Sequence, residues 1–567
     1  MDRDKFLSDF DLNNKEGLVF GELRLADLDI EIINDIIRQE NDKIDFLGSR
    51  ISPENAQLYS RLINRLYPYD EFIKSPYPIH EHNYKRYRKD LEGFFEYMQD
   101  TKPQLANFFL DYFQPYFADS VRHCHTYITG KSGLGKSEIM KTIIINHILR
   151  KNCAVVLIEP HGDLSRQIYK SKVFLDQEQA ERLITIDYNL DNHFTPVINI
   201  FDQINCKDEQ GNFIENDIDR VSQEYAKALS SICTSSTSGE LSYKMEMILR
   251  FCVRVILRKK DGCLEDLKRF MSTHNDDLIA LGRQDPNRAT RDFFESNDFN
   301  KVYKETKEAV YNRLQNLLQD TAFQNLTTGE STIKLKASIN TRKVIIINLS
   351  KGGIGSYASA SFGKLIIAVI KIIGLQRDKV QVEWQRVQAQ VFIDEFQNYI
   401  SDAIKETLEE LRKYKIFLTL ANQYVGQDLS VDEMRSIFAN TGMKIVAQTS
   451  PDNSTKIAKE LSIESEKINN LAQGEYYLMY ANNKKIPITI KIKGSTKYLG
   501  DSFAMDNTAW NGLKNAQIGK YYVKVGKYTY KPPQAPQSEN QNDYKQGFEN
   551  PKHRRTEQTP NFDDLSF

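Results

Sequence analysis

The sequence predicts an α/β fold in which helices flank a mostly parallel sheet, with an all-α domain inserted into the sheet and a helical segment before it. Three observations support this prediction. Short apolar runs alternate with helical patterns in residues 119–214 and again in residues 336–495, which is the order of strands and crossover helices in a parallel sheet. Residues 215–335 lack such runs and show helical periodicity instead. A glycine-rich loop joins the first strand of the sheet to its first helix.

The composition is that of an ordinary globular protein. The chain has 567 residues, of which 40% are hydrophobic and 27% are charged, and this length allows about two to four domains. A formal net charge of −1 gives no overall signature of nucleic-acid binding, so any such contact must come from local patches. The six cysteines are scattered without a C-x-x-C pair, which favours reduced thiols in a cytoplasmic protein.

Residues 1–118 form the helical segment, which is polar and contains clusters of aromatic residues. Its sharpest feature is an alternation of basic and aromatic residues, which is typical of surfaces that bind single-stranded nucleic acid. The alternation runs through Tyr84, Lys85, Arg86, Tyr87 and Arg88. A solvated helix face whose tyrosines pack inward would show the same pattern, so both interpretations stay open.

The strand predicted at Thr126–Thr129 leads into a loop of the pattern G-x-x-x-x-G-K-[ST], and a dense apolar pattern over Glu138–Ile145 predicts a buried helix after it. The glycines let the backbone turn tightly, so that successive N–H groups point at the phosphates of a nucleotide. The lysine then neutralises phosphate charge, and the serine hydroxyl binds Mg²⁺. The sequence therefore predicts a site for ATP and Mg²⁺. The loop consists of Gly130, Lys131, Ser132, Gly133, Leu134, Gly135, Lys136 and Ser137.

Two further strands end in acidic residues, at the edge of the sheet where α/β folds bind their ligands. The run Cys153–Ile158 is followed by Glu159, and the run Gln390–Ile393 is followed by Asp394 and Glu395. Two acids at a strand end are common, but beside a phosphate-binding loop they have a specific meaning. We expect Asp394 to hold Mg²⁺ and Glu395 to polarise the attacking water as a base.

The remaining strands complete the sheet. They are predicted at Leu183–Ile186, Val344–Leu349, Phe417–Gln423 and Lys444–Gln448, with a hairpin of Tyr476–Tyr480 and Pro487–Lys491 around an Asn-Asn turn. A helix from about residue 359 to residue 375 crosses back over the sheet. Its apolar run, Leu365–Ile370, is too short to span a bilayer and is bracketed by lysines, so we expect no integral membrane segment.

These patterns divide the chain into six predicted parts. They are an N-terminal mainly helical domain (1–118), a first part of the core (119–214), the inserted all-α domain (215–335), a second part of the core (336–495), a C-terminal extension (496–530) and a disordered tail rich in Pro, Gln and Asn (531–567).

The motifs and their order resemble the HerA/FtsK superfamily of hexameric DNA-pumping ATPases, which implies a RecA-like P-loop core. Within it, the chain most resembles the coupling proteins of type IV secretion and conjugation, the TraD/TraG class. The resemblance covers about residues 120–495. Four stretches carry it: His125–Ile128 with the P-loop, Glu159–Leu164, Asp394–Tyr399, and Arg412–Tyr414 running on to Ala421–Tyr424. The family usually has Asp where this chain has Glu159, and its membrane-bound members begin with transmembrane helices that we do not find in this sequence.

The resemblance also implies residue roles. It assigns phosphate, Mg²⁺ and Walker B functions to Lys136, Ser137, Asp394 and Glu395. Gln423, at a strand end, would be a sensor that contacts the attacking water or the γ-phosphate. A capping amide at the strand end is the alternative. Arg412 matches the arginine that the family donates across a subunit interface, and Arg435 is a second candidate. Either arginine could instead be an ordinary helix-surface residue.

The function implied is a cytoplasmic, DNA-stimulated ATPase that assembles as a homo-hexameric ring around DNA and moves it in conjugative transfer or mobilisation. Its partners would be DNA and a relaxase or secretion-channel components, and it would reach the inner membrane only through a partner. Three alternatives stay open: a HerA-like ATPase that serves a nuclease or effector in DNA repair or antiphage defence, a viral DNA packaging ATPase, and a scaffold with a silent nucleotide site. The intact pairing of Lys136 with Asp394 and Glu395 argues against the scaffold.

Overall fold

The computed structural model describes residues 18–19, 21–27, 30–48, 66–74, 87–112, 114–117, 123–203, 206–208, 210–234, 239–296, 298–379, 382–399, 404–424, 430–481, 487–498 and 501–530. Contacts group residues 1–528 into one compact unit and residues 529–567 into another. The predicted tail, residues 531–567, lies outside the described residues, and the other predicted boundaries stay predictions.

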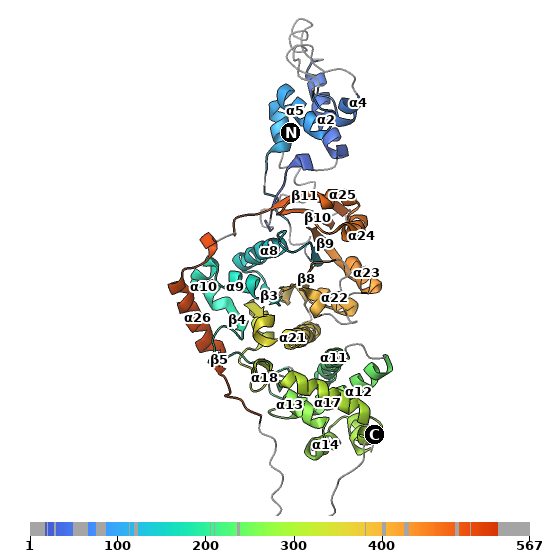
Figure 1. The fold of residues 1–567 in the computed structure, drawn as a ribbon, viewed down its shortest axis with the longest axis vertical. Helices are drawn as coiled ribbons and strands as arrows, with labels where there is room; N and C mark the ends of the chain where they lie inside the picture. The colour runs from blue at the N-terminus through green and yellow to red at the C-terminus, as the bar shows by residue number, and fades with distance from the viewer. Residues whose placement is uncertain are drawn as a thin grey trace, which may run out of the picture. The chain divides into compact units, whose positions relative to one another are not determined.

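A ten-stranded sheet forms the centre of the larger unit (Figure 1). The strand order is β1-β11-β10-β9-β2-β8-β7-β3-β6-β4, and the strands from β9 to β4 run parallel. All of these parallel strands are predicted from the sequence, and their presence in the structure confirms the α/β class. They are β2 (His125–Thr129), β3 (Ala154–Glu159), β4 (Leu183–Asp187), β6 (Val344–Asn348), β7 (Ala389–Ile393), β8 (Ile416–Asn422) and β9 (Thr441–Val446).

Antiparallel strands extend the sheet beyond β9. The predicted hairpin consists of β10 (Glu475–Ala481) and β11 (Pro487–Gly494), whose turn lies outside the described residues. Beyond it, β1 (Gly21–Glu22) pairs with β11 through Gly21 and Gly494. Strand β1 was not predicted from the sequence, because two residues are too few to show a strand period. The described part of the N-terminal segment, which is otherwise mainly helical as predicted, therefore also contributes one strand to the central sheet.

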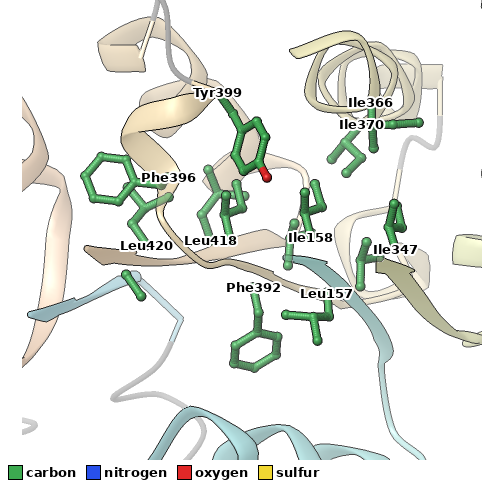
Figure 2. Close-up of a cluster of buried hydrophobic side chains, with 14 of the residues drawn as sticks. Leu157, Ile158, Ile347, Ile366, Ile370, Phe392, Phe396, Tyr399, Leu418 and Leu420 are labelled. Atoms are coloured by element: carbon green, nitrogen blue, oxygen red, sulfur yellow. The ribbon is translucent and has the colours of Figure 1, made fainter. Parts of the chain in front are cut away.

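Helices cover both faces of the sheet. Helix α8 (Lys136–Arg150) lies on one face and helix α21 (Ser356–Gln376) on the other (Figure 1). In Figure 2, Leu157 of β3 points to the α8 side, whereas the next residue, Ile158, points to the opposite side, where Ile370 lies. A strand that is buried on both faces has no solvent-facing positions, which explains why this part of the sequence is continuously apolar.

Helix α21 is a core helix by its contacts. In the part of the chain that the structure describes, Ser356–Lys379 is the one segment long and apolar enough to cross a membrane, and 78% of its most apolar window is buried inside the unit. The ammonium of Lys371, in the C-terminal third of α21, lies 3.0 Å from Glu224 of α11 (Glu215–Cys233) and 3.4 Å from Glu406 of α22 (Ile404–Lys413). This cation thus joins the inserted helices to the core.

The inserted region is helical, as predicted. Besides α11 it contains α12 (Gly239–Arg258), α13 (Leu264–Phe270), α14 (Asp276–Arg283), α15 (Arg288–Glu295), α16 (Asp298–Lys301), α17 (Lys304–Leu318), α18 (Thr321–Thr327) and α19 (Leu335–Asn340). Elsewhere the helices are α2 (Ile30–Gly48), α4 (Tyr69–Lys74), α5 (Leu91–Thr101), α6 (Pro103–Leu110), α9 (Asp163–Tyr169), α10 (Gln177–Arg182), α20 (Lys351–Ile354), α23 (Val431–Asn440), α24 (Pro451–Leu461), α25 (Ser465–Asn469) and α26 (Asn507–Tyr521).

Side chains of the C-terminal extension close the sheet edge at β4. The amide of Gln517, on α26, accepts a hydrogen bond from the backbone N–H of Thr185 (3.1 Å) and donates one to the carbonyl of Leu183 (3.0 Å). The hydroxyl of Tyr522 donates to the carbonyl of Thr185 (3.0 Å). Gln517 therefore satisfies edge groups that a further strand would otherwise pair.

A buried histidine ties β2 to its neighbours and makes stability depend on pH. The Nδ1 atom of His125 accepts from the N–H of Leu418 (2.8 Å), and its Nε2 lies 2.7 Å from the carbonyl of Leu408, so the ring is neutral with its proton on Nε2. Burial lowers the pKa of His125 to about 4. Since the unfolded imidazole titrates near pH 6.5, the unfolded chain takes up a proton first as the pH falls, and we expect a loss of about 3 kcal/mol between about pH 6.5 and pH 4.

Urea unfolding of the wild type and of His125→Gln over this pH range measures the effect. The variant should be less stable at pH 7 but should lose less stability on acidification. The same dependence on pH in both proteins would contradict the assignment to His125.

Candidate functional site

The glycine-rich loop between β2 and α8 adopts a conformation that its glycines require. Gly133 and Gly135 have φ angles of 80° and 102°, in the left-handed region that disfavours other residues. Gly135 also faces the ring of Tyr476, whose hydroxyl donates a hydrogen bond to the Gly135 carbonyl (2.7 Å). A Cβ atom at Gly135 would lie 2.3 Å from that hydroxyl. The loop thus has no room for a side chain at the position before the lysine.

Residues that follow β9 and precede β10 support the loop from outside. The amide of Gln473 donates to the carbonyl of Gly133 (3.0 Å), and the N–H of Lys131 donates to the carbonyl of Gln448 (3.0 Å). These supports were not predicted from the sequence, because they are distant from the loop along the chain. They become neighbours only because β9 pairs with β2 and β10 pairs with β9.

Two glycine substitutions separate backbone strain from this steric contact. Gly133→Ala meets no atom within 4 Å and should cost only the left-handed backbone, about 1–2 kcal/mol. Gly135→Ala must also displace Tyr476, so we expect a larger loss of stability and weaker nucleotide binding. Thermal unfolding and the titration of a fluorescent ATP analogue measure both effects. Equal losses in the two variants would show that Tyr476 does not constrain the loop.

The lysine of the loop meets both predicted carboxylates. The ammonium of Lys136 lies 3.0 Å from Glu395 Oε1 and 3.5 Å from Asp394 Oδ1, and all three side chains are buried. The backbone places them, because Asp394 continues the pairing with β3 through its N–H bond to the Ile158 carbonyl (3.0 Å). Glu395 then leaves the strand with a φ of 48°. A non-glycine residue in this region is strained, as often occurs at functional sites.

The two carboxylates differ in electrostatics. Burial raises the pKa of Asp394, and the neighbouring Glu395 raises it further, against the opposing effect of Lys136. For Glu395, burial also raises the pKa, but Lys136 and hydrogen bonds from Gln397 and Gln423 outweigh it, so the net pKa is lowered. Glu395 is therefore the member of the pair held more firmly as an anion, which suits a proton acceptor.

Gln423 lies where the predicted sensor should be. Its Nε2 donates to Glu395 Oε1 (2.8 Å), so it contacts the carboxylate that would activate water. The preceding residue, Asn422, accepts from the hydroxyl of Tyr127 (2.9 Å), which links the sensor strand β8 to the strand before the loop. Gln397 donates to the other oxygen, Glu395 Oε2 (2.6 Å). Gln397 was not predicted as a site residue, and its position two residues after Glu395 was the available signal.

Glu159 is turned into its own loop. Its carboxylate accepts from the backbone N–H groups of His161 (2.8 Å), Gly162 (2.7 Å) and Ser165 (3.2 Å). These contacts shape the turn between β3 and α9 at the carboxyl edge of the sheet. Burial raises the pKa of Glu159, which the hydrogen bonds partly oppose. A direct role of Glu159 in cofactor binding stays a prediction.

The structure does not bring the two candidate arginines to this site. Arg412 lies in the last turn of α22, at the amino end of β8, whereas the loop follows the carboxyl end of the parallel neighbour β2. The length of a seven-residue strand, about 23 Å, separates these edges. Arg435 is exposed on α23 and pairs with Asp432 (3.2 Å). Action of either arginine on another copy stays a prediction.

The basic and aromatic alternation of the N-terminal segment is only partly visible. Residues 84–86 lie outside the described residues. Tyr87 is nearly buried and its hydroxyl donates to Asp100 (2.8 Å), while Arg88 pairs with Glu92. The described members are therefore engaged with other residues of the chain, and nucleic-acid contact through this stretch stays a prediction.

Comparison with known proteins places the core among P-loop ATPases. Residues 119–369 match the family described as "Helicase HerA, central domain". No curated protein matches the sequence. The plasmid coupling protein TrwB, solved with the ATP analogue ADPNP, is 16% identical, and the match covers 69% of this chain and 91% of TrwB with a TM-score of 0.50. A trigonal form of bacterial conjugative coupling protein TrwBdeltaN70 with sulphate gives the same values. VirB4 of Thermoanaerobacter pseudethanolicus is 14% identical over 65% of this chain and 89% of its own, with a TM-score of 0.41.

Proposed function

We propose that this chain, whose core is a HerA/FtsK-type P-loop ATPase domain with a fold like that of conjugation coupling proteins, is an ATP-driven motor that moves DNA. The observation that carries the proposal is the convergence of Lys136, Asp394, Glu395 and Gln423 at the carboxyl edge of the sheet, beside a glycine-rich loop. These side chains come from three segments of the chain, and together they supply a phosphate-binding cation, two carboxylates and an amide at one site.

The residues fit ATP and Mg²⁺. Ser137, exposed in the first turn of α8, and Asp394 supply the oxygen ligands that Mg²⁺ prefers. The N-terminus of this fifteen-residue helix and Lys136 favour the negative charge of phosphates. Bound Mg²⁺ would neutralise charge that develops on the phosphates.

The other side chains act on the water. Glu395 accepts its proton, and Gln423 orients the Glu395 carboxylate through the hydrogen bond at Oε1. Arg412 would act on the nucleotide of a neighbouring copy in a hexameric ring, since it lies at the opposite edge of the sheet from its own loop. This arrangement would couple hydrolysis to assembly.

The cargo we propose is DNA in conjugative transfer or mobilisation, which the resemblance of the motifs and the TrwB-like fold support. A second candidate is a HerA-like engine that serves a nuclease or effector, and the match of residues 119–369 to the HerA central domain favours it equally. Co-purification separates the two, because a relaxase or secretion component would favour transfer and a nuclease would favour the second candidate.

The test is steady-state ATP turnover by the full chain, alone and with single- or double-stranded DNA, at several salt concentrations. Glu395→Gln measured in parallel reports any contaminating ATPase. We expect DNA to raise turnover and the increase to weaken steeply with salt, as phosphate contacts do. Turnover that no DNA alters would overturn the DNA motor and would leave an ATPase with another cargo.

A further inference from the structure

A second charged site lies at the amino edge of the sheet, at the opposite ends of the strands from the ATPase residues. It is a cavity of about 970 Å³ beside the starts of β7 and β8, which we name the basic groove. This volume is at the upper end of the range for ligand pockets, about 300–1,000 Å³. Five cations line the groove, against the two carboxylates Glu383 and Glu409. The cations are Arg342, Arg386, Arg412, Lys413 and Lys415.

Most of these cations are not neutralised by the protein. Arg342, Arg412, Lys413 and Lys415 make no ion pair with a carboxylate anywhere in the described ranges. Grouping like charges around one concave surface is unfavourable unless an anion offsets them. The groove therefore concentrates positive potential that attracts a polyanion, although the whole chain is almost neutral.

Two of the cations occupy strained backbone. Arg342 and Lys415 have φ angles of 56° and 55°, and they lie in the turns that lead from a helix into β6 and β8. Glycine is the usual residue at such positions, because a side chain is strained there. The helix dipole favours a cation at a helix end. It does not explain why both cations line the same cavity.

The groove also has aromatic surface. Trp384, in a short 3-10 helix (Glu383–Gln385), is 77% exposed, which is unusual for the largest apolar side chain. At the amino edge of the sheet, His123 stacks on Phe417 with ring centroids 5.3 Å apart and ring planes inclined by 13°. Both rings line the groove. Proteins bind single-stranded nucleic acid through cations that contact its phosphate backbone and through aromatic rings on which its unpaired bases stack.

We propose that the basic groove binds single-stranded nucleic acid, with phosphates on Arg342, Lys413 and Lys415 and a base stacked on Trp384. The assignment deepens the proposed function, on which it rests for the identity of the cargo, because it gives a strand a binding surface separate from the chain's own nucleotide site. Arg412, which also lines the groove, is left out of the assignment because the proposed function gives it to the nucleotide of a neighbouring copy. Bases in a duplex are already stacked on each other, so the groove should prefer single strands over duplexes.

The two tryptophans of the chain offer a direct assay. Trp510 is 9% exposed and stacks on Tyr169 with centroids 5.0 Å apart, so a ligand in solution should quench chiefly Trp384. We expect an oligothymidylate to quench the tryptophan fluorescence of the full chain. Lys415→Gln and Arg342→Gln should each weaken binding of the oligothymidylate. Each should also reduce the slope of log affinity against log salt concentration by about 0.7, the value for one phosphate contact with a single strand. Arg288→Gln, at an exposed arginine of the inserted region, is the matched control and should leave the titration unchanged.

A labelled oligothymidylate followed by anisotropy measures the stacking contribution. Trp384→Ala should weaken binding about 5- to 150-fold, while Trp384→Phe should retain most of it. Tyr243→Ala, at a tyrosine that is 70% exposed on α12, is the control for loss of an exposed ring. Thermal unfolding of each variant identifies any that lose the fold, and Trp384→Phe preserves the test in that case.

Three results would overturn the proposal: no quenching, quenching that Arg342→Gln and Lys415→Gln leave unchanged, or equal quenching by ATP alone. The last would assign the groove to a nucleotide held by a neighbouring copy. Basal ATP turnover is read separately and should be unchanged in Trp384→Ala. If one of these three results is found while DNA still stimulates ATP turnover, the groove assignment is wrong and the proposed motor stands. If DNA does not stimulate turnover, the proposed motor itself fails.

Discussion

Glu395→Gln is expected to lower the rate of ATP hydrolysis by about 10²- to 10⁴-fold, the usual contribution of a general base, without unfolding the chain. Glutamine has the same shape but cannot take up the proton of the attacking water. It also removes one of the two carboxylates that lie beside Lys136, at 3.0 Å. Since a phosphate would compete with these carboxylates for the lysine, we expect ATP to bind the variant more tightly than the wild type.

Single-turnover hydrolysis and the titration of a fluorescent ATP analogue measure these two effects separately. Glu466→Gln, at an exposed position of α25, is the matched control and should change neither. Wild-type turnover in Glu395→Gln would remove Glu395 from the chemistry, and weaker ATP binding would show that Lys136 does not exchange between the carboxylates and phosphate.

Lys136→Met is expected to abolish turnover and also to destabilise the fold near neutral pH by about 3–5 kcal/mol, the cost of leaving a buried charge unpaired. Asp394 and Glu395 would then lie together in a buried site without a cation. Their pKa values would rise above those of the unfolded chain, so the loss of stability should be full at high pH and should shrink as the pH falls toward about 4.

Urea unfolding between pH 5 and pH 8 tests this, with ATP absent. The double variant Lys136→Met with Glu395→Gln should recover part of the lost stability, because only one carboxylate remains charged. An equal loss at every pH, or no recovery in the double variant, would show that the damage comes from packing around the lysine rather than from charge.

Much of the core was predictable because its signals are local. Strands buried on both faces are continuously apolar, so the parallel strands could be located, and a phosphate-binding loop has a fixed spacing. The acids after β7 became informative through that loop, and the structure brings Asp394 and Glu395 to Lys136 as the sequence predicts. The match of residues 119–369 confirms the resemblance to the HerA/FtsK superfamily.

What could not be predicted depends on strand order. Tyr476 and Gln473 brace the loop only because the β9–β10 pair lies beside β2. The basic groove is likewise formed by turns that are distant in sequence and lead into β6 and β8, which two strands separate in the sheet, so Arg342 and Lys415 could not be grouped from their spacing. No local pattern distinguishes such cations from ordinary surface residues.

The closure of the sheet has a consequence for the order in which the protein can fold during its synthesis. At one edge, β1 pairs with β11 (Pro487–Gly494), and at the other, β4 is closed by Gln517. The central strand β2 pairs with β8 and β9, which are synthesised nearly three hundred residues later. A ribosome therefore releases the early strands long before their partners exist, and their unpaired edges remain open to other nascent chains.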